Sequence, residues 1–370
     1  MKRETPPFRA DQVGSLLRPA EVHDARVRHA EGKMGDDELR AIEDRAIERV
    51  IAKQESIGLS SITDGEMRRA AWTTDFLQEL DGVESVLADA VQFQGAQPHR
   101  TKVMKVTGKL GFSGHPMIRH FEFLKAHTRA TPKMTIPAPT MLASASRDWR
   151  AVIDRNVYPT LRDMFRDLGP AYRKAVRAFA DAGCRYLQLD DCSFAFVCDP
   201  AVRAKLKERG DDPDALLEDW VELINTALSD KPADMVVSTH ICRGNFRSTW
   251  MAQGGYEPVA DVLFNRINFD AYFLEYDSDR AGGFEPLRFL PKTGNKVVVL
   301  GLVTTKTGAL EDKDLIKRRI DQASRYVDLE RLCLSPQCGF ASTEEGNALT
   351  EDEQWNKLSR VVEIAEEVWG

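Results

Sequence analysis

Short apolar segments alternate with long stretches of helical periodicity along most of the chain. Strands are predicted where apolar and β-branched residues cluster, at residues 12–16, 59–63, 133–137, 185–189, 235–239, 267–274, 296–302 and 331–335. Amphipathic helices are predicted where apolar residues recur every three or four positions, over residues 36–57, 157–182, 213–229, 312–326 and 351–368. Strands that alternate with helices indicate βα units and a mainly parallel sheet.

The number and order of these segments favour an α/β fold of the (β/α)8 TIM-barrel class. A barrel of this kind fits a chain of this length, so we expect one domain over residues 1–370. Residues 88–112 interrupt the pattern because their polar and apolar positions alternate. They predict a β-hairpin inserted between the second and third βα units.

Composition narrows the classes of function. Hydrophobic residues make up 42% of the chain, and the net charge of -7 offers no overall basic field for nucleic acid or an acidic membrane surface. The N-terminus has no apolar stretch after its basic residues, and no segment approaches the roughly 18 apolar residues of a membrane span. We expect a cytoplasmic protein that binds small molecules, with neither nucleic acid nor membrane as a partner.

The cysteines are few and irregularly spaced, at positions 184, 192, 198, 242, 333 and 338. Without a secretion signal they do not form a disulfide framework, so each is a free thiol or a metal ligand. Cys184 and Cys333 lie inside apolar runs and are interpreted as small buried hydrophobes. The roles of Cys192 and Cys198 stay open.

Polar side chains gather at the ends of the predicted strands, where a TIM barrel places its chemistry because the βα loops converge there. They are Ser15, Asp64, Glu66, Asp190, Asp191, His240, Cys242, Glu275 and Cys338. Alone, the His240 and Cys242 pair is a weak metal signal, because a strand-end histidine is more often structural. With Glu275 and Cys338 at the same barrel mouth, the set offers the imidazole, thiolate and carboxylate groups that Zn²⁺ accepts. The alternative for Glu275 is an ordinary acid paired with Arg280.

Six ordered motifs resemble those of the cobalamin-independent methionine synthase family, in particular its C-terminal catalytic barrel and its short single-barrel members. They are V-G-S-L-L-R-P at 13–19, D-G-E-M-R-R at 64–69, Q-L-D-D at 188–191, H-I-C at 240–242, L-E-Y-D-S-D-R-A-G-G-F-E-P-L at 274–287 and L-S-P-Q-C-G-F at 334–340. The resemblance spans nearly the whole chain. It implies that the zinc ligands are His240, Cys242, Glu275 and Cys338, with Glu275 as the exchangeable one.

The resemblance also implies an activity. The chain would be a zinc-dependent methyltransferase, similar to 5-methyltetrahydropteroyltriglutamate-homocysteine S-methyltransferase. It would move a methyl group from 5-methyltetrahydrofolate or a simpler carrier to the thiol of homocysteine, forming methionine without cobalamin. A thiol is mostly protonated at neutral pH, and coordination to Zn²⁺ leaves it as a nucleophilic thiolate.

Three further residues match the family's amino-acid-binding positions. The resemblance implies that Ser15 binds the carboxylate end of homocysteine, and that Glu66 and Asp190 bind its ammonium. Two acids suit a primary ammonium because a buried positive charge must be paired. The structural alternatives are a turn hydroxyl for Ser15, an ion pair with Arg68 or Arg69 for Glu66, and a helix cap for Asp190.

The chain departs from the family pattern where the methyl donor binds. The long enzymes have a second, N-terminal barrel that helps to bind folate, and residues 137–146 lack the family's folate-stacking tryptophan. A partner protein that delivers methyl groups could act in place of that barrel, and the chain could also form a homo-oligomer. Lys306 stands where the long enzymes have a histidine thought to protonate the leaving group, so it is either a proton donor or a solvated lysine. Cys192 replaces a proline and is left out of the ligand set, because four residues already fill a tetrahedral site.

Other functions stay open. An epoxyalkane:coenzyme M transferase-like enzyme would use a comparable zinc site on a thiol that carries a sulfonate and no ammonium; Glu66 and Asp190 count against it, whereas the cations Arg18, Arg68 and Lys306 favour it. The decarboxylase branch of the superfamily lacks the zinc set. A non-catalytic zinc-binding protein would hold a closed site, whose coordination added thiol does not change.

Overall fold

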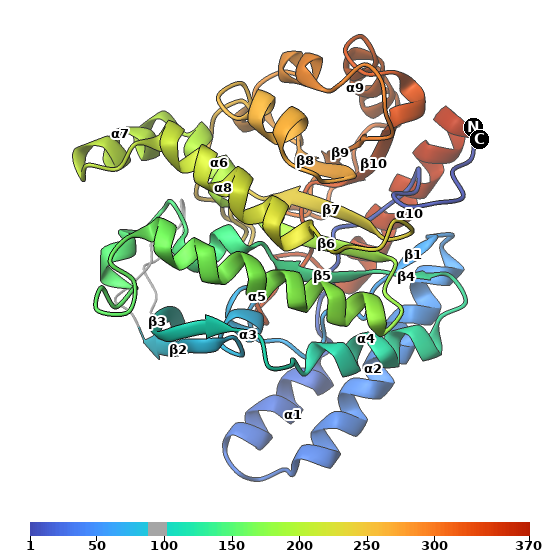
Figure 1. The fold of residues 1–370 in the computed structure, drawn as a ribbon. Coiled ribbons are helices and arrows are strands. Elements are labelled where there is room, and N and C mark those ends of the chain that lie inside the picture. The colour runs from blue at the N-terminus through green and yellow to red at the C-terminus, as the bar shows by residue number, and fades with distance from the viewer. Residues whose placement is uncertain (88–101) are drawn as a thin grey trace.

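The computed structural model describes residues 1–87 and 102–370 and shows a barrel of parallel strands surrounded by helices (Figure 1). Six strands form one parallel sheet in the order β10-β9-β8-β7-β6-β5. Their bounds are β5 (Met134–Pro137), β6 (Tyr186–Asp191), β7 (Val236–Ile241), β8 (Ala271–Glu275), β9 (Val297–Val303) and β10 (Leu332–Pro336). The short β1 (Ser61–Ile62) pairs in parallel with β4 (Thr131–Pro132), directly before β5. These strands confirm the predicted TIM-barrel class.

The N-terminal segment closes the barrel between β10 and β1. Ala10 forms a parallel bridge with Leu334 of β10, and the Thr63 hydroxyl after β1 donates to the Gly14 carbonyl at 2.7 Å. The predicted strand at residues 12–16 therefore occupies the first barrel position. The prediction of a regular strand was wrong, since the structure has no strand over residues 12–16 and the isolated bridge lies before them, at Ala10.

Helices cover the outside of the barrel (Figure 1). They are α1 (Ala20–Ala30), α2 (Asp36–Ser56), α3 (Thr74–Leu77), α4 (Met117–His127), α5 (Leu161–Asp181), α6 (Ser193–Cys198), α7 (Pro200–Glu208), α8 (Pro213–Leu228), α9 (Lys313–Ser324) and α10 (Glu351–Trp369). All five predicted amphipathic helices are present, as α2, α5, α8, α9 and α10. Helix α5 begins four residues later than predicted because the Thr160 side chain accepts the Asp163 N–H and caps it there. No helix among the described residues is both long and apolar enough to cross a membrane.

Short 3₁₀ and π turns join these elements. They are η1 (Pro139–Ala143), η2 (Trp149–Ala151), η3 (Val262–Arg266), η4 (Asp279–Ala281), η5 (Glu285–Phe289) and η6 (Leu329–Arg331). The π turn η3 ends just before Ile267, so β8 begins at Ala271, later than its predicted start.

An antiparallel hairpin interrupts the barrel between β1 and β4, as predicted. Its strands are β2 (Asp81–Leu87) and β3 (Lys102–Gly111). The hairpin begins at Asp81, earlier than the predicted residue 88. Residues 88–101 of the predicted hairpin lie outside the described residues.

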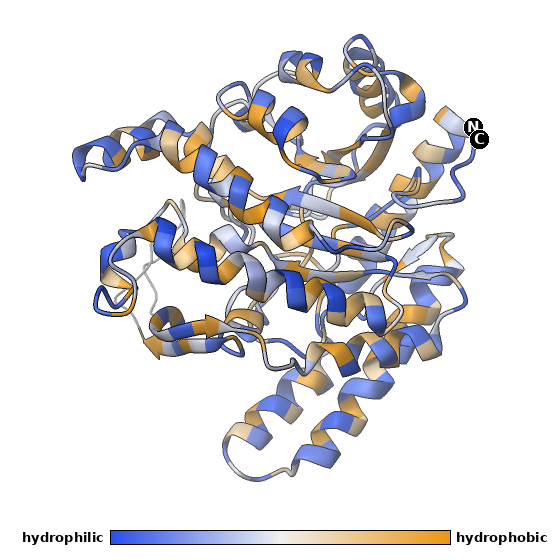
Figure 2. Cartoon of the chain, viewed as in Figure 1, coloured by the Kyte–Doolittle hydropathy of each residue, from blue (hydrophilic) through white to orange (hydrophobic). Residues whose placement is uncertain are grey.

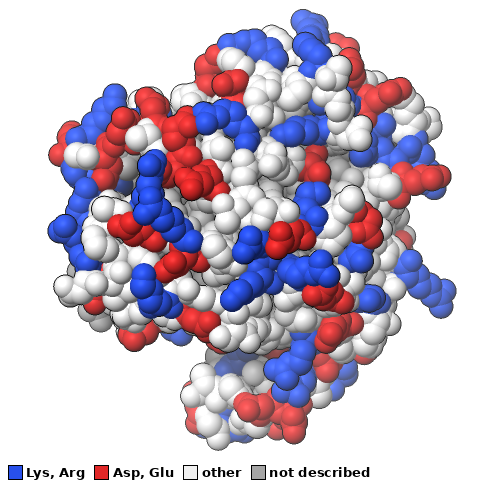
Figure 3. Space-filling model, in the orientation of Figure 1, with Lys and Arg blue, Asp and Glu red and all other residues white. Residues whose placement is uncertain are grey.

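Side chains alternate along each strand between two apolar layers. In β9, Val298 and Leu300 pack into the large cluster between strands and helices, whereas Val297 and Val299 pack into a small cluster with Phe273 inside the barrel. Figure 2 shows hydrophobic residues along the strands and on the inner sides of the covering helices. On the face drawn in Figure 3, basic and acidic side chains are interspersed without a large patch of one sign.

A buried ion pair holds the interior of the barrel to its first segment. The Nζ of Lys133 lies 3.3 Å from Oδ1 of Asp11, and both side chains are fully buried. The hydroxyl of Tyr186 donates to Oδ2 of Asp11 at 3.0 Å, and the Lys133 ammonium lies 4.0 Å from the ring centre of Phe273. Burial lowers the pKa of Lys133, while the charge of Asp11 opposes this change.

We expect Lys133→Met to lower the free energy of unfolding by about 3–5 kcal/mol, because it leaves the Asp11 carboxylate buried without its cation. Urea denaturation measures this loss. Lys205→Met on the exposed side of α7 is the control and should change stability by about 0.5 kcal/mol or less. Equal losses in the two variants would contradict a role for the ion pair.

Candidate metal centre

The strand register brings the predicted ligands to one mouth of the barrel. Every second residue of a strand faces the interior, so Glu275 shares the inward face of β8 with Phe273. His240 pairs with Phe273 across the sheet and is also inward. Cys242 follows β7 directly, and Cys338 comes two residues after β10.

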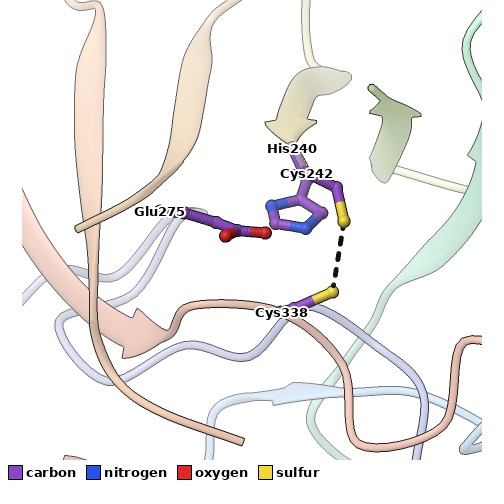
Figure 4. Close-up of side chains that lie close together, drawn as sticks. All are labelled: His240, Cys242, Glu275 and Cys338. Atoms are coloured by element: carbon purple, nitrogen blue, oxygen red, sulfur yellow. Dashed lines mark hydrogen bonds between the residues drawn. The ribbon is translucent and has the colours of Figure 1, made fainter. Parts of the chain in front are cut away.

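The four side chains form a compact cluster (Figure 4). One ligand atom from each of His240, Cys242, Glu275 and Cys338 lies within 4.8 Å of the other three, and all four residues are buried. The two sulfur atoms are 3.5 Å apart. A metal ion placed among these atoms would contact two sulfurs, one nitrogen and one oxygen, a donor set typical of Zn²⁺.

The cluster also carries polar atoms that a cation would satisfy. Both ring nitrogens of His240 and Oε2 of Glu275 are buried without a well-formed hydrogen bond to any described residue. Oε1 of Glu275 accepts the Arg243 N–H at 3.0 Å, which leaves Oε2 for the cluster. A buried polar atom without a partner destabilises the folded protein. A metal ion bound to these residues would remove this cost.

The thiols lead to the same conclusion. A hydrogen bond with Cys192, together with burial, raises the pKa of Cys242 well above its usual value in the absence of a cation. A hydrogen bond with Cys242, together with burial, does the same for Cys338. A coordinating cation reverses this, because it stabilises the thiolate. Cys192 itself contacts Cys242 but does not belong to the four-atom cluster.

The alternative partner for Glu275 is wrong. Arg280 pairs with Asp277 at 3.0 Å. Arg18, a cation considered as a substrate contact, is also engaged elsewhere, because it donates to the backbone carbonyls of Ala341 and Glu66, each at 2.8 Å.

A small pocket adjoins the cluster and contains all three predicted amino-acid-binding residues. Its volume is about 20 Å³. Its lining consists of Val13, Ser15, Glu66, Arg69, Trp72, Asp190, His240, Cys242, Cys338, Gly339 and Ser342. The structure therefore brings Ser15, Glu66 and Asp190 together beside three of the four cluster residues.

Local geometry fixes Ser15 in this pocket. Its Oγ accepts the Ala341 N–H at 3.2 Å, so its own O–H remains to donate. A Cβ on Gly339 would come within 2.0 Å of that oxygen, which explains the glycine in the last motif. Ser15 therefore lines the pocket while its Oγ accepts a loop N–H, as the turn alternative expected.

Glu66 is held by a strained turn. Its φ of 59° lies in the left-handed region, and its N–H donates to Oδ1 of Asp64 at 2.8 Å. The Thr135 hydroxyl donates to its Oε1. Backbone strain of this kind costs about 1–3 kcal/mol and is concentrated at functional sites.

The two acids of the Asp190-Asp191 pair have different surroundings. Asp190 shares the inward face of β6 with Gln188, whose Nε2 donates to its Oδ1 at 2.6 Å. Asp191 faces outward, and its Oδ1 accepts the Phe194 N–H at 3.1 Å in the first turn of α6. The helix-cap alternative for Asp190 therefore describes Asp191 instead.

Electrostatics in the pocket are dominated by burial. Burial raises the pKa of Glu66 to about 7 and that of Asp190 to about 6, while the guanidinium of Arg69 acts in the opposite direction on both. Arg69 forms an ion pair with Glu66, which confirms one of the alternatives considered for that residue. The sequence did not single out Arg69 as a pocket residue, because the adjacent Arg68 carries the same charge and only the fold separates the two.

Lys306 does not line this pocket. Its Nζ donates to Oδ1 of Asn245 at 3.2 Å and to the Thr249 carbonyl at 3.3 Å. Asn245 in turn lines a second, larger cavity. Lys306 therefore contacts a residue that lines the larger cavity but does not line it itself.

The larger cavity lies between the barrel mouth and the hairpin and has a volume of about 780 Å³ among the described residues. Trp72 lines both cavities, so they adjoin. Trp72 and Trp149 supply aromatic surface that residues 137–146 lack. Neither tryptophan could be recognised from a local sequence pattern, because the fold alone determines where each one lies.

Comparisons with known proteins agree with this geometry. The profile described as "Cobalamin-independent synthase, Catalytic domain" matches residues 8–367. The protein named "Uncharacterized protein YxjG" of Bacillus subtilis (strain 168) is 50% identical over 372 residues, which cover 100% of this chain and 97% of that protein. A solved structure from Listeria monocytogenes, described as a "Putative Vitamin-B12 Independent Methionine Synthase", is 41% identical with a TM-score of 0.80, and the similarity covers 100% of both chains.

More distant relatives carry a named activity. The 5-methyltetrahydropteroyltriglutamate--homocysteine methyltransferase of Bacillus velezensis (strain DSM 23117 / BGSC 10A6 / LMG 26770 / FZB42) is 24% identical over 333 residues, which cover 90% of this chain and 40% of that protein. With a family profile that matches nearly the whole sequence, the chain belongs to the cobalamin-independent synthase catalytic-domain family.

Proposed function

We propose that the protein transfers a methyl group to the thiol of homocysteine at a zinc ion held by His240, Cys242, Glu275 and Cys338. The observation that carries this proposal is the pocket in which Glu66 and Asp190 lie beside the four-residue cluster. A metal centre next to two acids suits a substrate that has a thiol at one end and an ammonium at the other. We further propose that residues 1–370 act as one unit.

Zinc, when bound, lowers the pKa of a thiol that it coordinates and so supplies a thiolate at neutral pH. The remaining work falls to the side chains. Glu66 and Asp190 bind the ammonium of homocysteine, and the Ser15 hydroxyl donates to its carboxylate. Because these residues are rigidly held, they aim the sulfur at the adjoining cavity.

The larger cavity is the place for the methyl donor. The homocysteine sulfur attacks the methyl carbon, the bond between that carbon and the donor breaks, and the donor leaves with the bonding electrons. Trp72 at the shared wall and Trp149 offer apolar surface against which a flat donor such as a methylated folate can stack. Lys306, through its contact with Asn245, is the candidate to protonate the leaving group.

One observation favours the coenzyme M type of reaction as a second candidate. Arg69 is a cation that lines the pocket, and a sulfonate requires a cation. However, Arg69 already pairs with Glu66, and Asp190 adds a further negative charge. A zwitterionic thiol therefore suits this pocket better than an anionic one.

We expect Cys338→Ser to weaken zinc binding by more than about 100-fold. Mutations of residues that only support the metal ligands weaken metal binding by up to about 100-fold, and loss of a ligand itself should cost more. Cys192→Ser is the matched control, because Cys192 is a buried thiol next to Cys242 outside the cluster. Anaerobic competition with a chromophoric chelator measures both affinities. An unchanged affinity in Cys338→Ser, or an equal loss in both variants, would contradict the assigned ligands.

Calorimetric titration of the zinc-loaded protein tests the proposed acceptor. L-homocysteine is expected to bind about tenfold or more tightly than coenzyme M and to release a proton, since a coordinating thiol must lose one. Titrations in two buffers with different ionisation enthalpies count the protons. Tighter binding of coenzyme M would instead support the second candidate.

Binding of the homocysteine ammonium by Glu66 and Asp190 is expected to depend on pH. At pH 5.5 Glu66 and Asp190 are largely protonated, because their pKa values of about 7 and 6 lie above this pH. We therefore expect the preference for L-homocysteine over 4-mercaptobutyrate, which has no ammonium, to fall about tenfold or more from pH 8 to pH 5.5. The ratio of the two dissociation constants cancels the titration of the thiols. A ratio that does not change with pH would show that the acids do not bind the ammonium.

A further inference from the structure

The guanidinium of Arg69 lies in the pocket where the ammonium of homocysteine is expected to bind. Arg69 is buried, forms an ion pair with Glu66 and lines the pocket together with Ser15 and Asp190. Its Nε is buried without a well-formed hydrogen bond to any described residue. The guanidinium therefore still has donor capacity that no described residue uses.

Space in the pocket requires Arg69 to move when a substrate binds. A volume of about 20 Å³ holds about one water molecule, whereas homocysteine has eight non-hydrogen atoms. A neighbouring pocket of about 150 Å³ is lined by Glu66 and Arg69 as well. Arg69 therefore borders free space on a second side, next to Glu66.

Charge balance indicates where the guanidinium goes. The ammonium and carboxylate of homocysteine are attached to the same carbon, so a carboxylate arrives whenever the ammonium reaches Glu66 and Asp190. Without Arg69, three carboxylates would then share one ammonium in a buried site. With Arg69, the guanidinium and the ammonium together face three carboxylates. The uncompensated buried charge then falls from two negative charges to one.

We propose that Arg69 is the carboxylate-binding residue of this site, and that its fork-shaped guanidinium exchanges the Glu66 carboxylate for that of the substrate. This inference rests on the proposed function, since it assumes a thiol that also carries an ammonium and a carboxylate. Ser15 then supplements the guanidinium with one hydroxyl. Arg69 selects α-amino acid thiols over amino thiols that lack a carboxylate.

Titration of zinc-loaded variants with two thiols tests this role. L-homocysteine carries the carboxylate, and 3-aminopropane-1-thiol lacks it. In Arg69→Met, the dissociation constant of homocysteine is expected to rise about 30-fold or more, as is typical when one partner of a buried charge pair is removed. The dissociation constant of 3-aminopropane-1-thiol should stay the same or fall, because Arg69 no longer competes for Glu66.

Two further variants exclude a general effect on folding. Arg69→Lys keeps the charge without the fork and should retain part of the preference for homocysteine. Arg68→Met removes a neighbouring, partly buried arginine that pairs with Asp44 outside the pocket, and it should keep the wild-type preference. Because the readout is a ratio of two thiols, a lower zinc content does not change it.

The outcomes separate this inference from the proposed function. Equal weakening of both thiols in Arg69→Met, or an unchanged ratio, would show that Arg69 has only a structural role. If the wild-type protein bound homocysteine with proton release in that case, the proposed acceptor would still stand. Failure of the wild-type protein to bind homocysteine at all would overturn both.

Discussion

The alternation of side chains along parallel strands is the constraint on which the site depends. The same inward face that carries Phe273 in the barrel interior carries Glu275 and, in the neighbouring strand, His240 at the mouth. A shift of one residue in either strand would turn the ligand outward into the apolar layer under the helices. The Lys133 and Asp11 ion pair supports this register, because it ties β5 to the segment that closes the barrel.

Burial determines the electrostatic properties of the side chains at the barrel mouth. It leaves His240 and Glu275 with polar atoms that a cation would satisfy, and it raises the pKa values of Glu66 and Asp190 toward neutrality. Both effects create a demand for positive charge, the first for a metal ion and the second for an ammonium or guanidinium. Arg69 meets the second demand while no substrate is present, which is why the free pocket is almost filled.

Much of this could be predicted from the sequence, because the strands and their ends have strong local signals. Apolar runs located seven of the barrel strands, and the polar residues that follow them gave Ser15, Glu66, Asp190 and the four cluster residues. The first strand was predicted too regularly, since its pairing depends on side chains such as Thr63. Arg69, Trp72 and Trp149 were missed because their roles follow from how loops pack, which no local pattern encodes.

X-ray absorption at the zinc edge, with and without L-homocysteine, tests whether the metal centre accepts a substrate thiol. We expect two sulfur neighbours at about 2.3 Å in the free protein, from Cys242 and Cys338, and three after the thiol binds. The added sulfur would show that the centre is open to substrate and that the pocket beside it delivers the thiol. An unchanged count of two, at saturating homocysteine, would indicate a closed structural site and contradict the proposed transfer.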